Sequence, residues 1–249
     1  MHDHPRAAVW RPSFVGPVGS ERGEGLMGEG DDRLRTLARG LGAARVLVVP
    51  RDAVIGLLDS STGLLSASPV TCLDIRTAAR EAHDAGRSLC VDVSACGPLG
   101  CPAVRLGADV AVSLLDDIAA VGVARGVDDE LVASLAAEAA ESCDDAEKAP
   151  SLARARLDGW HRSSDAAQVV AAYLSCHPRV EKVSYPGLVT SADHRVAAST
   201  LVSGFGLYVD YVDVSGDGRW QRVDARGWDG ITLVEQLENQ LARCHPKAR

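Results

Sequence analysis

The sequence predicts an α/β protein in which a mostly parallel sheet lies between helices and a smaller α+β domain follows. The first observation is residues 73–117, where a helical pattern over 75–85 is followed by short apolar runs at 88–91 and 107–112. Helix, strand, loop and strand in this order are typical of a parallel α/β sheet. The second observation is an acidic stretch that ends at Ala149-Pro150, after which helical and strand patterns of a different order begin.

The composition is typical of a globular protein. Of the 249 residues, 46% are hydrophobic and 24% are charged, and the formal net charge is -8. Nucleic acid is not an expected partner, because an acidic chain has no electrostatic footprint for a phosphate backbone. Residues 1–14 lack the apolar core of a signal peptide, and no run approaches the about 18 apolar residues that span a membrane. Seven cysteines without a C-x-x-C pair suit a reducing environment, so we expect a cytoplasmic protein with no membrane association.

The elements before residue 73 follow from local patterns. Residues 1–30 are rich in Gly, Pro and charge and indicate a flexible N-terminal arm. Asp31-Asp32 is expected to cap a helix over 33–41. Apolar runs predict strands at 46–49 and 54–58.

The motifs of residues 73–117 resemble a known family. The pattern AH-x-x-G-x-x-x-x-VD ends at Asp92, and a Pro-containing loop, LGAD and an apolar strand come after it. This order is similar to the trans-sulfuration enzymes, the pyridoxal-phosphate (PLP) proteins that include cystathionine synthases and lyases and methionine γ-lyase. The resemblance implies a remnant of the fold type I PLP-dependent transferase large domain.

The resemblance also assigns positions in a cofactor site. Asp92 takes the place of the aspartate that pairs with the pyridine nitrogen of PLP in the family. Where the family carries His-Ser-x-Thr-Lys, an ungapped count gives Ser113-Leu-Leu-Asp-Asp117, so the Schiff-base lysine is replaced by Asp117. Leu115 stands where the family has a phosphate contact, and Gly63 stands where it has an asparagine beside the cofactor. The order of strands and loops around the family's cofactor site is therefore kept, while the lysine amine that forms the Schiff base is missing.

The family's phosphate-binding turn also has a changed counterpart. Pro50-Arg51-Asp52 follows the first strand where the family has Ser-Ser-Gly-Met, so the small residues and hydroxyls are absent.

The C-terminal half carries a second match. Residues 177–188, HPRVEKVSYPGL, are similar to the family's C-terminal domain, and strands at 207–213 and 220–223 and helices at 163–174, 194–201 and 231–244 are expected around them. The family's arginine for the substrate carboxylate has its nearest counterpart in Arg222, with Arg226 as a competitor. A bidentate Arg–carboxylate clamp is chemically reasonable there.

Each candidate has a structural alternative. Asp92 is either a cofactor contact or a cap for the following loop. Asp116-Asp117 is either an acid/base or metal pair, or a helix N-cap or solvated pair on one helical turn. His161, His177 and His194 lack the spacing of a metal site, so no metal is expected. The cysteines are interpreted as structural residues.

Together these observations predict three segments: an arm at 1–30, an α/β cofactor-type domain at 31–149 and an α+β domain at 150–249. Without lysine at position 117 no internal aldimine can form, and the lysines of the sequence, Lys148, Lys182 and Lys247, lie at other positions. We therefore expect a catalytically deficient homologue, binding PLP non-covalently at best. It would act as an interaction or regulatory subunit, in a homo-oligomer or in a hetero-oligomer with an intact relative. The alternative is an active carbon–sulfur lyase or synthase with a rearranged site.

Overall fold

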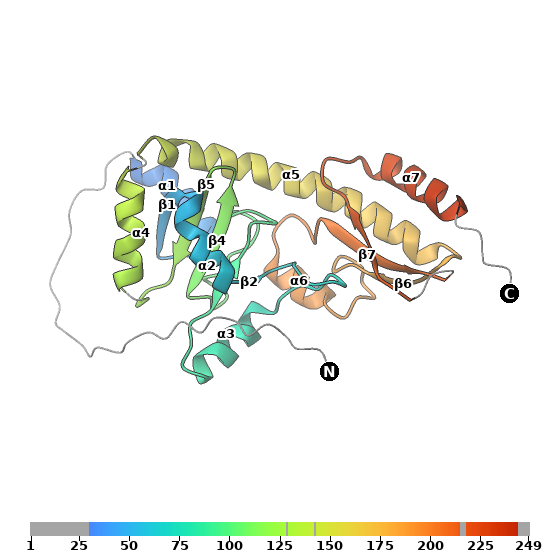
Figure 1. The fold of residues 1–249 in the computed structure, drawn as a ribbon, viewed down its shortest axis with the longest axis horizontal. Coiled ribbons are helices and arrows are strands. Elements are labelled where there is room, and N and C mark those ends of the chain that lie inside the picture. Colours follow the sequence, from blue (N-terminus) through green and yellow to red (C-terminus); the bar gives the residue numbers. More distant parts are fainter. Residues whose placement is uncertain (1–29, 128, 142, 215–217, 244–249) are drawn as a thin grey trace.

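The structure is a computed structural model that describes residues 30–243, except 128, 142 and 215–217. The predicted N-terminal arm, apart from Gly30, lies outside these residues. Two sheets lie side by side along one long helix, α5 (Cys143–Cys176), which reaches from the first sheet to the second (Figure 1). No helix in the described part of the chain is long and apolar enough to cross a bilayer.

The first sheet has five strands in the order β1-β5-β4-β3-β2. They are β1 (Arg45–Pro50), β2 (Thr62–Gly63), β3 (Cys90–Asp92), β4 (Val110–Leu115) and β5 (Ile118–Val123). β2, β3 and β4 pair in parallel, whereas β5 pairs antiparallel with both β4 and β1. Only β5 therefore runs against the other strands, and the predicted α/β class with a mostly parallel sheet is confirmed.

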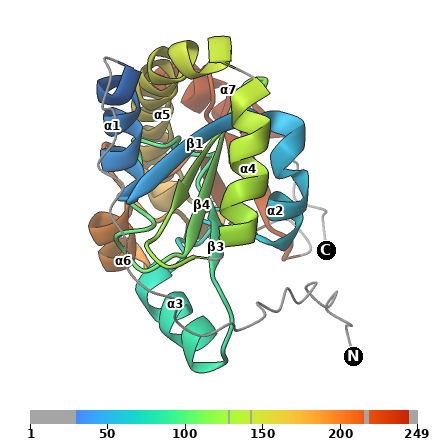
Figure 2. The ribbon, with the colours of Figure 1, turned by 90° about the vertical axis from the view of Figure 1, so that its left-hand side faces the viewer.

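Helices cover both faces of this sheet, as Figure 2 shows. The helical segments around it are α1 (Gly30–Leu41), η1 (Arg51–Val54), α2 (Ile55–Ser60), α3 (Ile75–Asp84), α4 (Asp129–Glu141) and α5. Alternate residues of β4 serve the two faces: Ala111 and Leu115 join the core under α1 and α5, whereas Val110 and Val112 join the core under α4. Both faces are thus buried, which explains the continuous apolar runs of β4 and β5.

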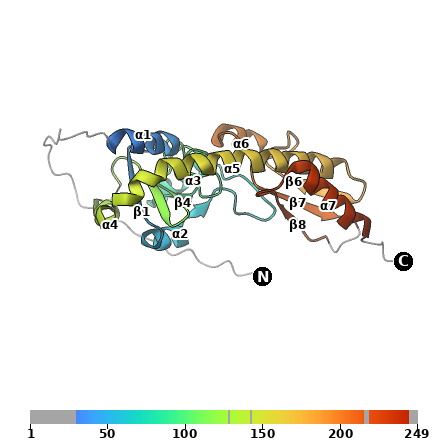
Figure 3. The same ribbon diagram turned by 90° about the horizontal axis from the view of Figure 1, so that it is seen from above.

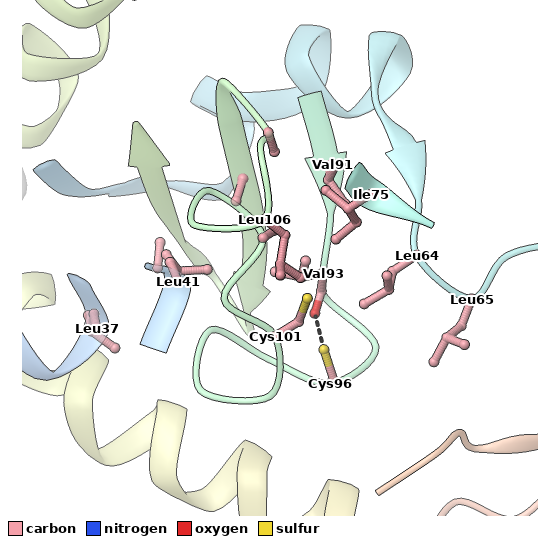
Figure 4. Packing of buried hydrophobic residues seen from close by; sticks show 14 of the residues in the cluster. Leu37, Leu41, Leu64, Leu65, Ile75, Val91, Val93, Cys96, Cys101 and Leu106 are labelled. Atoms are coloured by element: carbon pink, nitrogen blue, oxygen red, sulfur yellow. Dashed lines mark hydrogen bonds between the residues drawn. The ribbon is translucent and has the colours of Figure 1, made fainter. Parts of the chain in front are cut away.

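The main core cluster gathers side chains from well-separated segments (Figure 4). Leu41 of α1, Ile75 of α3 and Val91 of β3 are almost fully buried in it. Cys96 and Cys101 belong to the same cluster, and the Cys96 thiol donates to the Val93 carbonyl oxygen at 3.5 Å. Burying each large apolar side chain stabilises the fold by about 1.5–3 kcal/mol, so these contacts fix the orientation of β3.

The second sheet has three antiparallel strands in the order β6-β7-β8. Its elements are β6 (Val180–Ser184), β7 (Tyr208–Asp213), β8 (Gln221–Asp224), α6 (His194–Thr200) and α7 (Gly230–Arg243). The second half of α5 and the helix α7 pack together over this sheet, and Figure 3 shows α7 beside the far end of α5.

The break expected at Ala149-Pro150 is wrong. Pro150 lies inside α5, which continues to Cys176. Trp160 of this helix is buried in the first core cluster, and from Ala166 onward its buried residues belong to the second. The backbone thus passes from one core to the other within a helix, and the division into domains at 31–149 and 150–249 stays a prediction.

Two further sequence interpretations are wrong. Residues 54–58, predicted as a strand, form the end of η1 and the start of α2. Ile55 is 51% exposed, so the run is not buried on two faces as the strand interpretation required; a short apolar run alone does not distinguish strand from helix. Asp31-Asp32 was expected to cap its helix, but α1 begins at Gly30 and includes both residues.

The N-terminal cap of α3 gives a pH-dependent prediction. Asp74 accepts from the backbone N–H of Thr77 at 3.2 Å and from its hydroxyl at 2.8 Å, and these bonds lower the pKa of Asp74. A lowered pKa stabilises the fold above the unfolded-state pKa of about 3.9, and this stabilisation is lost as the pH falls through the folded-state pKa. We expect Asp74→Ala to reduce the free energy of unfolding by about 1 kcal/mol at pH 7, with the difference shrinking below pH about 4. Urea titrations at several pH values measure this difference in the free energy of unfolding. Asp74→Ser, which keeps a hydrogen-bond acceptor without charge, is the control. A loss for Asp74→Ala that does not change with pH would contradict the prediction.

Two buried serines should respond oppositely to loss of the hydroxyl. Ser113 on β4 is fully buried, and its hydroxyl has no hydrogen-bond partner among the described residues. Ser164 on α5 is also buried, but its hydroxyl accepts from the backbone N–H of Phe205 at 2.7 Å. An unsatisfied buried hydroxyl costs about 1–3 kcal/mol. We expect Ser113→Ala to raise the free energy of unfolding by about 1 kcal/mol and Ser164→Ala to lower it by about 1–3 kcal/mol, measured by urea unfolding. Equal losses for both variants would refute the assignment.

Candidate functional site

The carboxyl end of β4 is a tight hairpin. Leu115 pairs with Ile118, so only Asp116 and Asp117 join β4 to the antiparallel β5. Asp116 has a φ of 59°, a conformation that Asp tolerates better than most residues. The expectation of one helical turn, or of a helix N-cap, is wrong here, because two flanking strands pair directly across the two aspartates.

The position assigned to the Schiff-base lysine therefore lies at the surface of a turn. The side chains of Asp116 and Asp117 are both exposed, as the solvated alternative expects. The Asp116 carboxylate lies 3.9 Å from the guanidinium of Arg156, and the Asp117 carbonyl oxygen accepts from the Arg51 backbone N–H at 2.9 Å. Leu115 is buried in the core. The turn thus presents two exposed carboxylates at the position that the resemblance assigns to the Schiff-base lysine.

Asp92 lies at the end of β3, as predicted, and it organises the next loop. Its Oδ1 accepts from the backbone N–H of Ser94 at 2.8 Å and from the Ser94 hydroxyl. The Ser94 hydroxyl oxygen in turn accepts from the Leu114 backbone N–H at 2.9 Å. These bonds connect the ends of β3 and β4, and they match the capping alternative for Asp92.

The segments near Asp92 differ from those that surround a cofactor phosphate in the family. Gly63 of β2 pairs with Asp92, and a Cβ at Gly63 would lie 2.6 Å from the Ser66 hydroxyl, so a larger side chain there requires movement of Ser66. After β1, Pro50 leads into the four-residue η1 without any side-chain capping bond. The residues Pro50-Arg51-Asp52 thus lack the glycine and the hydroxyl groups that a phosphate-binding turn uses.

A pocket of about 350 Å³ lies between the two halves of the chain, next to the hairpin. It is lined by Ala95, Leu115, Asp116, Leu152, Ala155, Arg156, Gly159, Trp160, Ser163, Leu207, Arg226 and Gly227. A cavity with mixed apolar and charged lining at a junction between two sheets is a candidate ligand site. Most of its lining comes from α5, from Leu207 just before β7, and from Arg226 and Gly227 after β8. The sequence reasoning missed Arg156 and Trp160, because only the packing of α5 brings them to the hairpin.

Arg222 does not line this pocket. Its guanidinium forms two hydrogen bonds of 2.7 and 2.8 Å with Asp210, its cross-strand partner, which is fully buried. It also donates to the Ala67 carbonyl oxygen. Asp210 accepts from the backbone N–H of Val70 at 2.6 Å. The Arg–carboxylate clamp predicted for a substrate is thus formed with the protein's own Asp210, which lies opposite Arg222 in the pairing of β7 with β8.

The competitor Arg226 lines the pocket and lies on the surface. It pairs bidentately with Asp224, and both side chains are exposed, at 59% and 40%. Arg226 lies 5.6 Å from the ring centroid of Tyr208, and Arg222 lies 4.9 Å from it. Of the two arginines, Arg226 is therefore the one within reach of a ligand.

The remaining candidates are separate from one another. The His161 ring lies near the Ser203 carbonyl oxygen, His177 contacts Glu238, and His194 stacks on Phe205. No group of three or more His, Cys, Asp or Glu side chains suited to a metal occurs in the described part of the chain.

The buried cysteines are protonated at neutral pH. Burial raises the pKa of the thiols of Cys72, Cys90 and Cys101 to about 12, and that of Cys96 well above its usual value. A thiol must ionise to act as a nucleophile, so these four are packing residues.

Comparison with known proteins supports the resemblance. No model of a known protein family matches the sequence. A homocysteine synthase from Schizosaccharomyces pombe is 33% identical over 73 residues, which are 29% of this chain and 16% of that protein. CalE6, a methionine gamma lyase from Micromonospora echinospora, has a similar structure with a TM-score of 0.56 and 20% identity, over 76% of this chain and 70% of its own. MetB from Corynebacterium glutamicum gives a TM-score of 0.58 and 17% identity, over 74% of this chain and 62% of its own.

The predicted resemblance to the trans-sulfuration enzymes is confirmed. The chain has their fold type I architecture, and it spans only part of the length of these relatives.

The described residues do not fit a covalently held PLP. Lys148 on α5 and Lys182 on β6 are both exposed, and Lys182 lies 3.2 Å from Glu181. Neither lines the pocket beside the hairpin, and Lys247 lies outside the described residues. Asp92 already uses Oδ1 to hold Ser94.

The two Arg–Asp pairs of the C-terminal sheet provide a matched test of the structural role of Arg222. Removing Arg222 leaves the buried Asp210 carboxylate without its counter-charge, so we expect Arg222→Ala to lower the free energy of unfolding by about 3–5 kcal/mol. Arg226→Ala removes an exposed pair and should cost less than about 1 kcal/mol. Chemical denaturation measures both, and equal effects would show that burial of Asp210 contributes nothing.

Proposed function

We propose that this chain is a catalytically deficient relative of the trans-sulfuration enzymes that acts as an interaction or regulatory subunit. The observation that carries the proposal is the two-residue hairpin between β4 and β5, with Asp117 at the lysine position. A Schiff base needs an amine within bonding reach of the aldehyde carbon, and a carboxylate cannot replace it.

Three further features support the proposal. The segment corresponding to the family's phosphate turn is Pro50-Arg51-Asp52, where a carboxylate repels an anion. Arg222, the counterpart of the substrate-binding arginine, is engaged by Asp210. Leu115, which the resemblance places at a phosphate contact, is buried in the core.

The partners follow from the same resemblance. Family members assemble through their large domains, so association into a homo-oligomer, or with an intact lysine-bearing relative, is the expected mode of action. The cytoplasm is the proposed location, because the cysteines of the described residues are free thiols.

Treatment with PLP and borohydride tests the missing aldimine directly. On addition of PLP to the purified chain we expect no Schiff-base absorption band that survives gel filtration. After borohydride reduction the intact mass should be unchanged, because non-covalent PLP is not trapped. Elimination from cystathionine should be absent. An active methionine γ-lyase treated in parallel shows that the reduction works.

A stoichiometric pyridoxyl adduct on one lysine, with elimination activity lost when that lysine is replaced, would establish the alternative of an active carbon–sulfur lyase or synthase with a rearranged site. Substitution of the adducted lysine and of Lys182 in parallel separates specific from random modification, since Lys182 lies exposed on β6.

A further inference from the structure

Three arginines line a second pocket, which lies beside the carboxyl end of α1. This pocket has a volume of about 300 Å³ and is lined by Arg35, Ala38, Arg39, Gly42, Ala43 and Arg105. Figure 2 shows α1, which supplies half of the lining residues, on the outer side of the sheet. The pocket is separate from the one beside the hairpin, since the two share no lining residue.

The backbone brings these arginines together. Arg35 and Arg39 are four residues apart on α1, so they project from the same face of the helix. Gly42 ends α1 with a φ of 69°, and a Cβ there would lie 2.5 Å from the Cβ of Arg105. The Val104 backbone N–H donates to the Leu41 carbonyl oxygen at 3.0 Å. The loop that carries Arg105 is therefore held directly against the end of the helix.

Two arginines of this pocket are not neutralised by a carboxylate of the described residues. No acidic residue of the described part of the chain lines the pocket. Arg39 and Arg105 form no ion pair within the described residues, in contrast to Arg222 and Arg226, each of which has a carboxylate partner. Arg35 has an interaction of its own. The carboxyl end of α1 contributes about half a negative charge, which the guanidinium groups of Arg39 and Arg105 outweigh.

More positive charge lies next to the pocket. Arg45 and Arg125 are exposed and line a third cavity of about 320 Å³, whose lining begins at Ala44, directly after Ala43 of the arginine pocket in the chain. The chain as a whole has a net charge of -8, so this concentration of arginine is local.

We propose that the pocket formed by Arg35, Arg39 and Arg105 binds the phosphate group of a small phosphate-bearing ligand. Guanidinium groups donate parallel N–H···O bonds to phosphate oxygens, and a group with two or more negative charges neutralises several arginines at once. The acidity of the rest of the chain disfavours a long polyanion such as nucleic acid, so the ligand is small.

Calorimetric titration at constant ionic strength tests the site with two probes, inorganic phosphate and pyrophosphate. We expect both to bind the wild-type chain, with pyrophosphate the tighter. Arg39→Gln and Arg105→Gln should each weaken pyrophosphate binding at least tenfold. Arg87→Gln is the control, because Arg87 is equally exposed and lines none of the three pockets described above.

The outcomes separate clearly. Loss of binding in both pocket variants with normal affinity in the control supports the site. Absence of binding to the wild type, affinities of both pocket variants within twofold of wild type, or an equal loss in the control would overturn it. Circular dichroism shows whether each variant is folded. If Arg39→Gln disturbs α1, Arg105→Gln still tests the site, because Arg105 lies outside any helix. The test does not depend on the absence of an aldimine.

Discussion

The attachment of the chain's second sheet to its first half depends on one buried carboxylate. Asp210 on β7 accepts hydrogen bonds from Arg222 of the neighbouring strand and from the backbone N–H of Val70, which belongs to the first half of the chain. The Val70 carbonyl oxygen accepts from Ser184 of β6, so both polar groups of this residue are satisfied by the second sheet. A buried charge needs such partners, because an unpaired one is strongly unfavourable in a protein interior.

This attachment and the helix α5 together define the pocket beside the hairpin. Trp160 is buried in the first core, and its indole N–H donates to the carbonyl oxygen of Val202, which lies between β6 and β7 of the second sheet. The same helix then enters the second core through Ala166. Because both halves are fixed to one helix, the cavity between them is a constant part of the fold, whether or not chemistry takes place in it.

Much of the fold could be predicted from local sequence, and the parts that could not are those set by pairing between strands. The helix at 75–85 has a clear periodicity and a capping residue, and the strand ending at Asp92 is a short apolar run, so both are predictable from local sequence. The run at 54–58 is too short for its hydrophobic periodicity to distinguish a strand from a helix. The Asp116-Asp117 turn depends on the pairing of β4 with β5, and the engagement of Arg222 by Asp210 depends on the pairing of β7 with β8. Neither pairing is visible in the spacing of residues along one segment.

The length of the β4–β5 connection also limits how this chain could change. Because Leu115 pairs with Ile118, the two residues between them are confined to a tight turn. A side chain introduced at position 117 therefore lies on an exposed turn. The substitution Asp117→Lys would therefore place its amine in solvent, away from the interior. Recovery of an amine-based active centre would instead require inserted residues that lengthen the loop and carry it back over the end of the sheet.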